Sequence, residues 1–381
     1  MSVRQRKHTL QEAYITGVGA FLPGDPISSE RIEDHIGRIG GKPSLLGRRA
    51  LGWNGVATRH YALDAQGRAQ HSNAGMCAEA VRAALDDAGL GREDLAFLAA
   101  ATTQGDYLVP GHAAAVHGEL GGEPLEIASF QSVCGASLMA AKSAFQAVRT
   151  GEHAVAAAAA SEFSSRWFRP SFYEGTALLD AKGRLRAEAD FLRFTLSDGA
   201  GAIIMEPRPR PHGLSLKVHF IDAVSMAGSF EPCMWAGATV EERGATWSHI
   251  GPAAAHAAGA VALLQDFELL KRVIRAWVGV YLKKVDEGRI VPAEIDHLLC
   301  HYSARSLRDE LLQLLEKTAG MIPEERWFSN LSTVGNIGSA SIWVMLEAFL
   351  KSGRLKAGER VLCVVPESGR AFVGFMLLEA V

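Results

Sequence analysis

Uninterrupted runs of apolar residues recur along this chain and predict buried β-strands. Residues 95–102 and 154–161 are two such runs of strand length, as expected for strands covered on both faces of a sheet. Between strands, residues 72–88 carry apolar side chains on one helical face, and Ser72 or Asn73 can serve as the N-cap. Strands that alternate with helices in this way predict an α/β fold.

The second part of the chain repeats the pattern of the first. Residues 93–100 (EDLAFLAA) align with residues 293–300 (AEIDHLLC), and a Pro-rich stretch at 207–213 separates the two parts. Gly151 lies 17 residues after Cys134, and Gly353 lies 17 residues after Asn336. We therefore predict two pseudo-symmetric halves, residues 1–206 and 207–381. In the second half, residues 252–283 are expected to form one long helical region.

Composition narrows the classes of function. The 381 residues are 48% apolar, and the formal net charge is −3, so no basic face is required and nucleic acid is not expected as a partner. The five cysteines are widely spaced and contain no CxxC pair, which argues against a zinc site or a disulfide framework and favours a cytoplasmic location. The basic N-terminus is not followed by an apolar segment, and no run is long enough to span a membrane.

Cys134 is the first candidate for chemistry. It stands between a strand-like stretch and an Ala-rich helix, in the sequence SVCGAS. The backbone N–H groups and the positive dipole end of a helix favour a thiolate, so we expect Cys134 to be a nucleophile. The alternative is a small buried hydrophobic residue in a tight turn.

Two residues of the second half are expected to face Cys134. His301 follows the predicted strand 294–300, and Asn336 lies in a glycine-bracketed turn before an apolar helix. Loops that follow the strands of such sheets gather at one edge, where ligands bind. Each residue also has a structural alternative, because a His is often only hydrogen-bonded and an Asn often only tolerates a turn.

With these motifs, the chain resembles the thiolase-fold condensing enzymes of the β-ketoacyl-(acyl carrier protein) synthase III type. The resemblance rests on SVCGAS around Cys134, the strand end at His301, the turn VGNIGSAS around Asn336 and the sequence SDGAGA at 197–202. It implies a duplicated αβαβα fold and an acyl-Cys134 intermediate. It also implies an oxyanion hole formed by the N–H groups of Cys134 and Gly369, and enolate stabilisation by His301 and Asn336.

The resemblance further implies the ligands and partners. No metal or redox cofactor is expected, because the substrates are acyl thioesters carried on acyl carrier protein or coenzyme A. The family is usually dimeric, and Val109 is the candidate for a residue that reaches the acyl pocket of the partner subunit. Trp53 and Arg59 are candidates for contacts with the pantetheine carrier, with plain surface positions as the alternative.

The chain also departs from the family pattern. Tyr302 and Ser303 replace polar amides after His301, and the usual glycine triplet reads Gly369-Arg370-Ala371. A Glu, Glu162, ends the strand at which common synthases carry an Asp. Glu162 is therefore a candidate for a second acid or base, with a structural carboxylate as the alternative.

The specific function expected is a ketosynthase. Glu162 and the long aromatic segment 164–193 that follows it, together with FLPGDP at 21–26 and NGVATRHYA at 54–62, are most similar to the ketosynthases of dialkylresorcinol and cyclohexanedione formation. Those enzymes join two acyl thioesters, one of them a β-ketoacyl thioester, and close a ring. An acyltransferase that makes an ester or amide from the same acyl-cysteine is the alternative. A catalytically inactive partner subunit and a papain-like hydrolase are less consistent with the sequence, since Cys134 is present and the chain is duplicated.

Overall fold

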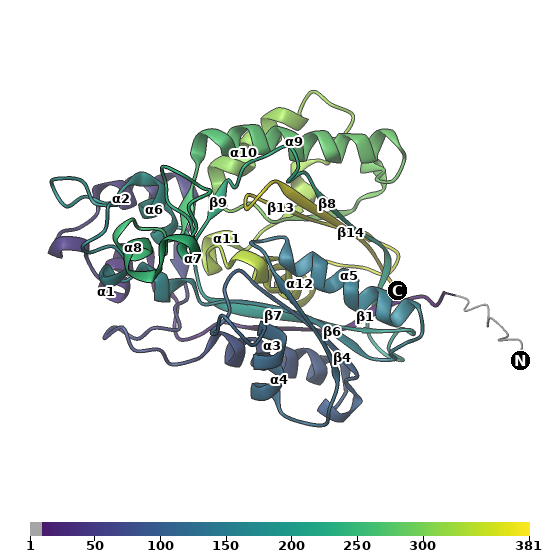
Figure 1. The fold of residues 1–381 in the computed structure, drawn as a ribbon. Helices are drawn as coiled ribbons and strands as arrows, with labels where there is room; N and C mark the ends of the chain where they lie inside the picture. The colour runs from purple at the N-terminus through teal and green to yellow at the C-terminus, as the bar shows by residue number, and fades with distance from the viewer. Residues whose placement is uncertain (1–9) are drawn as a thin grey trace, which may run out of the picture.

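The computed structural model describes residues 10–381 and has a ten-stranded mixed sheet at its centre (Figure 1). The strand order is β12-β11-β13-β14-β8-β1-β7-β6-β4-β5. The first half of the chain contributes β1 (Tyr14–Phe21), β4 (Phe97–Thr102), β5 (Glu126–Gln131), β6 (Ala156–Glu162) and β7 (Gly199–Glu206). The other five are β8 (Leu216–Ser225), β11 (His297–Cys300), β12 (Trp327–Phe328), β13 (Arg360–Glu367) and β14 (Phe372–Ala380).

The same pairing pattern occurs twice in this sheet. Read inward from the two edges, the strands are β5-β4-β6-β7-β1 and β12-β11-β13-β14-β8. In both series the first two pairings are parallel and the next two are antiparallel. The two series meet where β1 pairs with β8. The boundary predicted after residue 206 coincides with the end of β7. The division of the chain into two domains at this point stays a prediction.

Helices cover both outer faces and fill the space between the two halves of the sheet. In Figure 1, α5 and α12 lie between the halves, α3 and α4 cover one outer face, and α9 and α10 cover the other. Their bounds are α3 (Asn73–Ala88), α4 (His112–Leu120), α5 (Ala136–Arg149), α9 (Phe267–Asp286), α10 (Arg305–Leu315) and α12 (Ser341–Lys351). This layering is the predicted αβαβα arrangement.

Local sequence signals account for several of these bounds. Ser72 caps α3, since its hydroxyl accepts a hydrogen bond from the backbone N–H of Gly75. Gly151 and Gly353 follow α5 and α12 with φ of 74° and 66°, a conformation that glycine adopts without steric cost. All six residues of β4 are buried, as its apolar run predicts.

The long helix predicted for residues 252–283 is wrong. This segment contains α8 (Pro252–Ala257), the short strand β10 (Leu264–Gln265) and then α9. Asp266 starts α9 as its N-cap by accepting from the N–H of Leu269. The capping carboxylate and the pairing of β10 with β9 (Met234–Trp235) interrupt the helical pattern.

A smaller group of segments extends from one end of the sheet, on the left in Figure 1. It contains α1 (Ile32–Ile36), α2 (Leu45–Asn54), α6 (Ala187–Arg193), α7 (Trp247–Ile250) and α8, together with the β2–β3 pair (Ile27–Ser28 and Thr58–Arg59). The short helix α11 (Leu331–Val334) precedes the Asn336 turn. Of these segments, α2 and α6 line the site described next.

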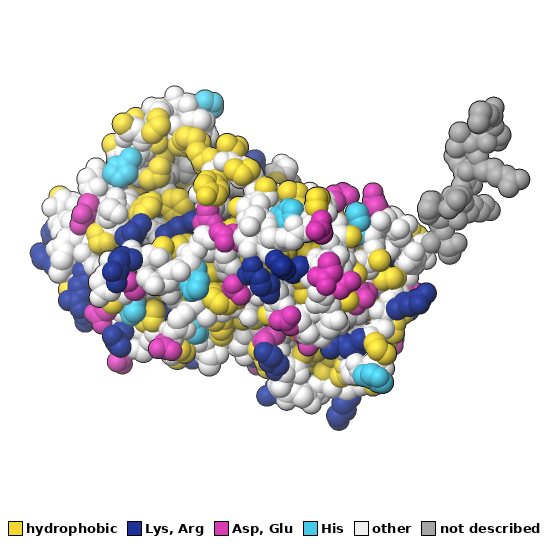
Figure 2. Space-filling view, turned by 90° about the horizontal axis from the view of Figure 1, so that it is seen from below, with side chains coloured by type: hydrophobic (Ala, Val, Ile, Leu, Met, Phe, Trp, Pro, Cys, Tyr) yellow, Lys and Arg dark blue, Asp and Glu magenta, His cyan; other side chains and the backbone are white. Residues whose placement is uncertain are grey.

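The surface carries charges of both signs. Figure 2 shows Lys and Arg side chains interspersed with Asp and Glu over the face seen from below. Within the described part of the chain, no helix is both long enough and apolar enough to cross a membrane.

Candidate active site

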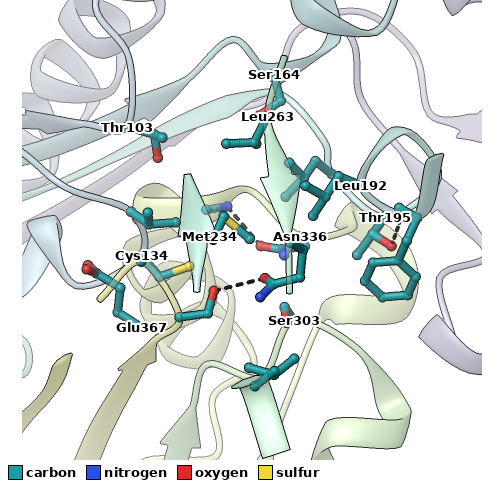
Figure 3. Close-up of a pocket in the computed structure, with 18 of the residues that line it drawn as sticks. Thr103, Cys134, Ser164, Leu192, Thr195, Met234, Leu263, Ser303, Asn336 and Glu367 are labelled. Atoms are coloured by element: carbon teal, nitrogen blue, oxygen red, sulfur yellow. Dashed lines mark hydrogen bonds between the residues drawn. The ribbon is translucent and has the colours of Figure 1, made fainter. Parts of the chain in front are cut away.

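The three residues predicted for catalysis line one cavity of about 720 Å³. Cys134 lies in the turn between β5 and α5, His301 directly follows β11, and Asn336 lies in the turn before α12. Their exposed fractions are only 6%, 3% and 2%. Figure 3 shows Cys134, Asn336 and Glu367 around this cavity. The fold therefore brings turns from both halves to one site.

Burial and nearby charge oppose a thiolate at Cys134, whose role as a nucleophile stays a prediction. Burial raises the pKa of the Cys134 thiol well above its ordinary value, and the nearby carboxylates of Glu367 and Glu162 raise it further. The start of α5 favours a thiolate, but desolvation and two negative charges outweigh this effect. Cys134 is thus held as a thiol at neutral pH.

His301 is held neutral and has an unused ring nitrogen. Burial lowers the pKa of its imidazole to about 4. Its Nε2 is buried and has no hydrogen-bond partner among residues 10–381, while its backbone N–H donates to the carbonyl of Val364 at 2.8 Å. A buried ring nitrogen without a partner is costly unless a ligand supplies one.

Asn336 is fixed by its own turn. Its Oδ1 accepts from the N–H of Gly338 at 2.9 Å, and its carbonyl accepts from the N–H of Ser197 at 2.8 Å. This leaves the Nδ2 amide hydrogens to donate into the cavity. His301 and Asn336 thus present two uncharged hydrogen-bonding groups on the wall of one cavity.

Glu162 holds the Asn336 turn in place. Its Oε1 accepts from the N–H and hydroxyl of Thr103 at 3.0 and 2.8 Å, and from the N–H and hydroxyl of Ser339 at 3.1 and 2.6 Å. The carboxylate therefore joins the end of β4 to the turn that carries Asn336. Burial raises the pKa of Glu162 while these donors oppose the rise. This geometry favours the structural alternative for Glu162.

Glu367 is a site residue that the sequence reasoning missed. It ends β13, is 3% exposed and lines the cavity. Its Oε1 accepts from the Ser132 hydroxyl at 2.7 Å, and its Oε2 accepts from the N–H of Gly135 at 2.8 Å. The duplication offered a signal, because Glu162 ends β6 and β13 is the counterpart of β6 in the repeat.

Gly369 lies on the cavity wall beside the Cys134 turn. Its carbonyl accepts from the N–H groups of Cys233 and Met234. A Cβ at position 369 would come within 2.8 Å of Glu367 Oε1 and 2.9 Å of Val133, so a larger residue would displace these side chains. Its predicted role in the oxyanion hole stays a prediction.

The two predicted carrier contacts differ sharply. Trp53 lines the cavity and is 61% exposed, as a contact at the entrance requires. Arg59 is fully buried, and its guanidinium donates to the carbonyl of Phe194 at 2.8 Å and to the hydroxyl of Ser29 at 3.2 Å. The assignment of Arg59 as a carrier contact is wrong, because Arg59 ties β3 to the segment after α6.

The segment 164–193, which follows β6, forms one apolar wall of the cavity. Further walls come from α2, α9 and α10. The large apolar side chains of the lining are Leu46, Trp53, Phe163, Trp167, Phe168, Phe191, Leu192, Leu196, Met234, Trp235, Leu263, Phe267, Leu270, Ile274, Trp277, Leu307 and Leu311. The wall thus suits an extended hydrocarbon chain.

Comparisons with known proteins agree with this fold. Residues 285–377 match the family model for the C-terminal part of 3-oxoacyl-(acyl-carrier-protein) synthase III. The tetronic acid condensing enzyme AbyA1 is 20% identical, with 96% of this chain and 99% of that chain covered and a TM-score of 0.76. FabH, the 3-oxoacyl-(acyl carrier protein) synthase III of Pseudomonas aeruginosa, is 18% identical, with 97% and 98% covered and a TM-score of 0.71.

A variant of OleA from Xanthomonas campestris is also similar, at 19% identity, with 99% of this chain and 100% of that chain covered and a TM-score of 0.75. At sequence identities of 18–20%, the similarity to these structures establishes the fold of this chain. The predicted thiolase-like fold of the synthase III type is therefore confirmed.

Proposed function

We propose that this chain is an acyl-thioester condensing enzyme. The observation that carries the proposal is the convergence of the Cys134 thiol, the unpartnered Nε2 of His301 and the free Nδ2 of Asn336 in one apolar cavity. The match of residues 285–377 to the synthase III family model supports it.

The geometry suits a two-stage reaction. In the first stage Cys134 attacks an acyl thioester, its sulfur bonds to the acyl carbon, and the donor thiol leaves with the proton of Cys134. The N–H groups of Cys134 and Gly369 are the donors proposed for the tetrahedral oxyanion. In the second stage His301 and Asn336 bind the carbonyl oxygen of a second thioester, whose C2 attacks the acyl-cysteine as an enolate. Uncharged donors stabilise the negative charge that develops on this oxygen.

The finer assignment is a β-ketoacyl thioester as one substrate, followed by ring closure to a cyclohexanedione or dialkylresorcinol precursor. An acyl carrier protein is the proposed donor, with its pantetheine arm entering past Trp53. No cofactor is assigned to these steps.

The test combines intact-protein and product mass spectrometry. Acyl thioesters on coenzyme A and on carrier protein are incubated with the protein, and the adduct mass on Cys134 identifies the donor. A β-ketoacyl thioester is then added. A carbon–carbon product supports the proposal, whereas an ester or amide product would assign the acyltransferase alternative. A protein with no adduct on Cys134 would refute both.

We also propose a homodimer that forms along the edge strand β5. Glu126 and Ile127 of β5 are exposed, and an exposed strand edge readily pairs with another chain. Next to it, Leu108 and Val109 are each 83% exposed. This segment lies beside β5, because the N–H of Ala113 donates to the Ser129 hydroxyl. Sedimentation of wild type and V109D measures the dimer, and a monomeric wild type would refute it.

A further inference from the structure

Two buried carboxyl groups share the cavity with Cys134. Glu162 and Glu367 are 4% and 3% exposed, and within residues 10–381 the hydrogen bonds that they accept come from uncharged donors. Burial of an unpaired carboxylate is costly, so such groups are retained chiefly where they have a chemical task. The proposed acyl transfer to Cys134 gives neither group such a task.

The two carboxyl groups are bonded differently. All four donors to Glu162 converge on its Oε1 and fix the Asn336 turn. Glu367 accepts from the Ser132 hydroxyl at Oε1 and from the Gly135 N–H at Oε2, and the backbone of Val133 also hydrogen-bonds its carboxylate, so its donors all belong to the Cys134 turn. Three donors leave a lone pair of this carboxylate free. The charge of Glu367 also acts on Cys134 more strongly than that of Glu162 does.

The location of Glu367 fits a proton acceptor for the second substrate. In the condensation, C2 of that substrate must come within about 3.5 Å of the acyl carbon on the Cys134 sulfur. The Glu367 carboxylate is hydrogen-bonded to Gly135, the residue that follows Cys134. A carboxylate on this wall is within reach of a hydrogen at C2, while His301 and Asn336 hold the carbonyl oxygen. Figure 3 shows Glu367 beside Cys134, with Asn336 farther along the cavity.

The charges of the cavity also bear on the second substrate. A substrate that forms its carbanion by losing carbon dioxide would carry a carboxylate at C2. That group would enter beside Glu162 and Glu367, where like charges repel. The one Arg of the lining, Arg370, is exposed and donates to the carbonyl of Phe230 at 2.7 Å.

We propose that Glu367 is the catalytic base of the condensation and that the second substrate is a thioester with hydrogen, not a carboxylate, at C2. This rests on the proposed function. Glu367 takes a proton from C2, and the C–H electron pair becomes the enolate. The enolate carbon bonds to the acyl carbon, the bond from that carbon to the Cys134 sulfur breaks, and Glu367 returns the proton to the sulfur. The products are the condensed thioester and the Cys134 thiol.

The main test compares E367Q with wild type. A Gln side chain keeps the size of Glu and can still accept from Gly135, but it cannot take a proton at neutral pH. We expect that acylation of Cys134, read by intact mass, does not fall below wild type, because E367Q removes a negative charge that raises the pKa of the thiol. Condensation should fall by about 10²-fold to 10⁴-fold, the usual contribution of a positioned base. The aspartate variant E367D, which keeps a carboxylate on a shorter stem, should recover part of the rate.

Hydrogen exchange supplies a second readout that a purely structural role would not move. Octanoyl-CoA with deuterium at C2 is incubated with each protein in water, and loss of deuterium is followed by mass spectrometry. Wild type should remove the label faster than E367Q. E359Q changes a carboxylate that pairs with His297 away from the cavity, so it serves as the matched control and should exchange like wild type. Equal exchange and equal condensation in wild type and E367Q would overturn the inference.

The failure of this inference is distinguishable from failure of the proposed function. If wild type forms no carbon–carbon product from any thioester pair, the proposed function fails. If wild type condenses and E367Q condenses equally well, only the role of Glu367 fails. If malonyl-CoA replaces the second thioester and E367Q retains that reaction in full, the assigned substrate class is wrong.

Discussion

Removal of the His301 imidazole should slow condensation strongly while it spares acyl transfer to Cys134. The Nε2 atom of His301 is buried without a partner in the part of the chain that the structure describes, so its hydrogen bond is available to the substrate oxygen. Loss of one donor to a developing oxyanion typically lowers kcat by about 10²-fold to 10³-fold, or about 3–4 kcal/mol. H301A should therefore form acyl-Cys134 at close to the wild-type rate and condense about 10²-fold to 10³-fold more slowly.

The protonation state of His301 adds a pH signature. A pKa of about 4 in place of 6.5 corresponds to about 3 kcal/mol against the charged ring. At pH 7 only about one molecule in 1,000 carries the charged form. The condensation rate should thus show no transition from His301 between pH 5 and pH 8.

The same shift affects stability. Between pH 4 and 6.5 the unfolded chain binds more protons at His301 than the native state does. The free energy of unfolding should therefore rise with pH across this window. The H301A variant should lack that rise.

The assay follows acylation by intact mass and condensation by product mass on the same samples. H297A is the matched control, because His297 lies at the other end of β11, where its Nε2 pairs with Glu359 at 2.9 Å. H297A should condense at close to the wild-type rate. A condensation rate for H301A within threefold of wild type would refute the assignment, as would an equal loss of acylation and condensation.

Three further predictions test the supports of the site. R59M should lower the free energy of unfolding by about 1–3 kcal/mol, since Arg59 donates a hydrogen bond to the carbonyl of Phe194. Urea unfolding measures this free energy. An unchanged stability with a raised KM for the carrier would contradict the structural role of Arg59. Burial raises the pKa of Asp198 to about 6, so the native state keeps this proton longer and stability should fall as pH rises from about 4 to 6, which D198N should not show. G135A should lower both the thermal midpoint of unfolding and the rate of Cys134 acylation, because a Cβ at position 135 would lie 2.3 Å from the Phe372 ring. A melting curve for G135A that matches wild type would contradict this.

Local sequence patterns determined the elements of this fold. The apolar run of β4 requires burial on both faces, and Ser72 offers its hydroxyl to a neighbouring N–H. Such signals depend on residues close in sequence, which is why they can be read from one chain. The prediction of one long helix at residues 252–283 was wrong because the pairing of β10 with β9 joins segments that are separate in sequence. A local pattern cannot show such a contact.

The duplication also allowed the sequence to predict which turns meet. Cys134 and Asn336 precede equivalent helices, and His301 follows a strand of the same sheet. The alignment of the two halves was therefore sufficient to predict that these three residues share one site.

Only the tertiary structure decided the electrostatics of the Cys134 stretch. The helix start predicts a thiolate, but the pKa of Cys134 depends on desolvation and on Glu367, which is more than 200 residues away in sequence. The burial of Arg59 has the same kind of cause, since its partner Phe194 is distant in the chain. Helix dipoles follow from local sequence, whereas burial and the distances between charges are set by the packing of the whole chain.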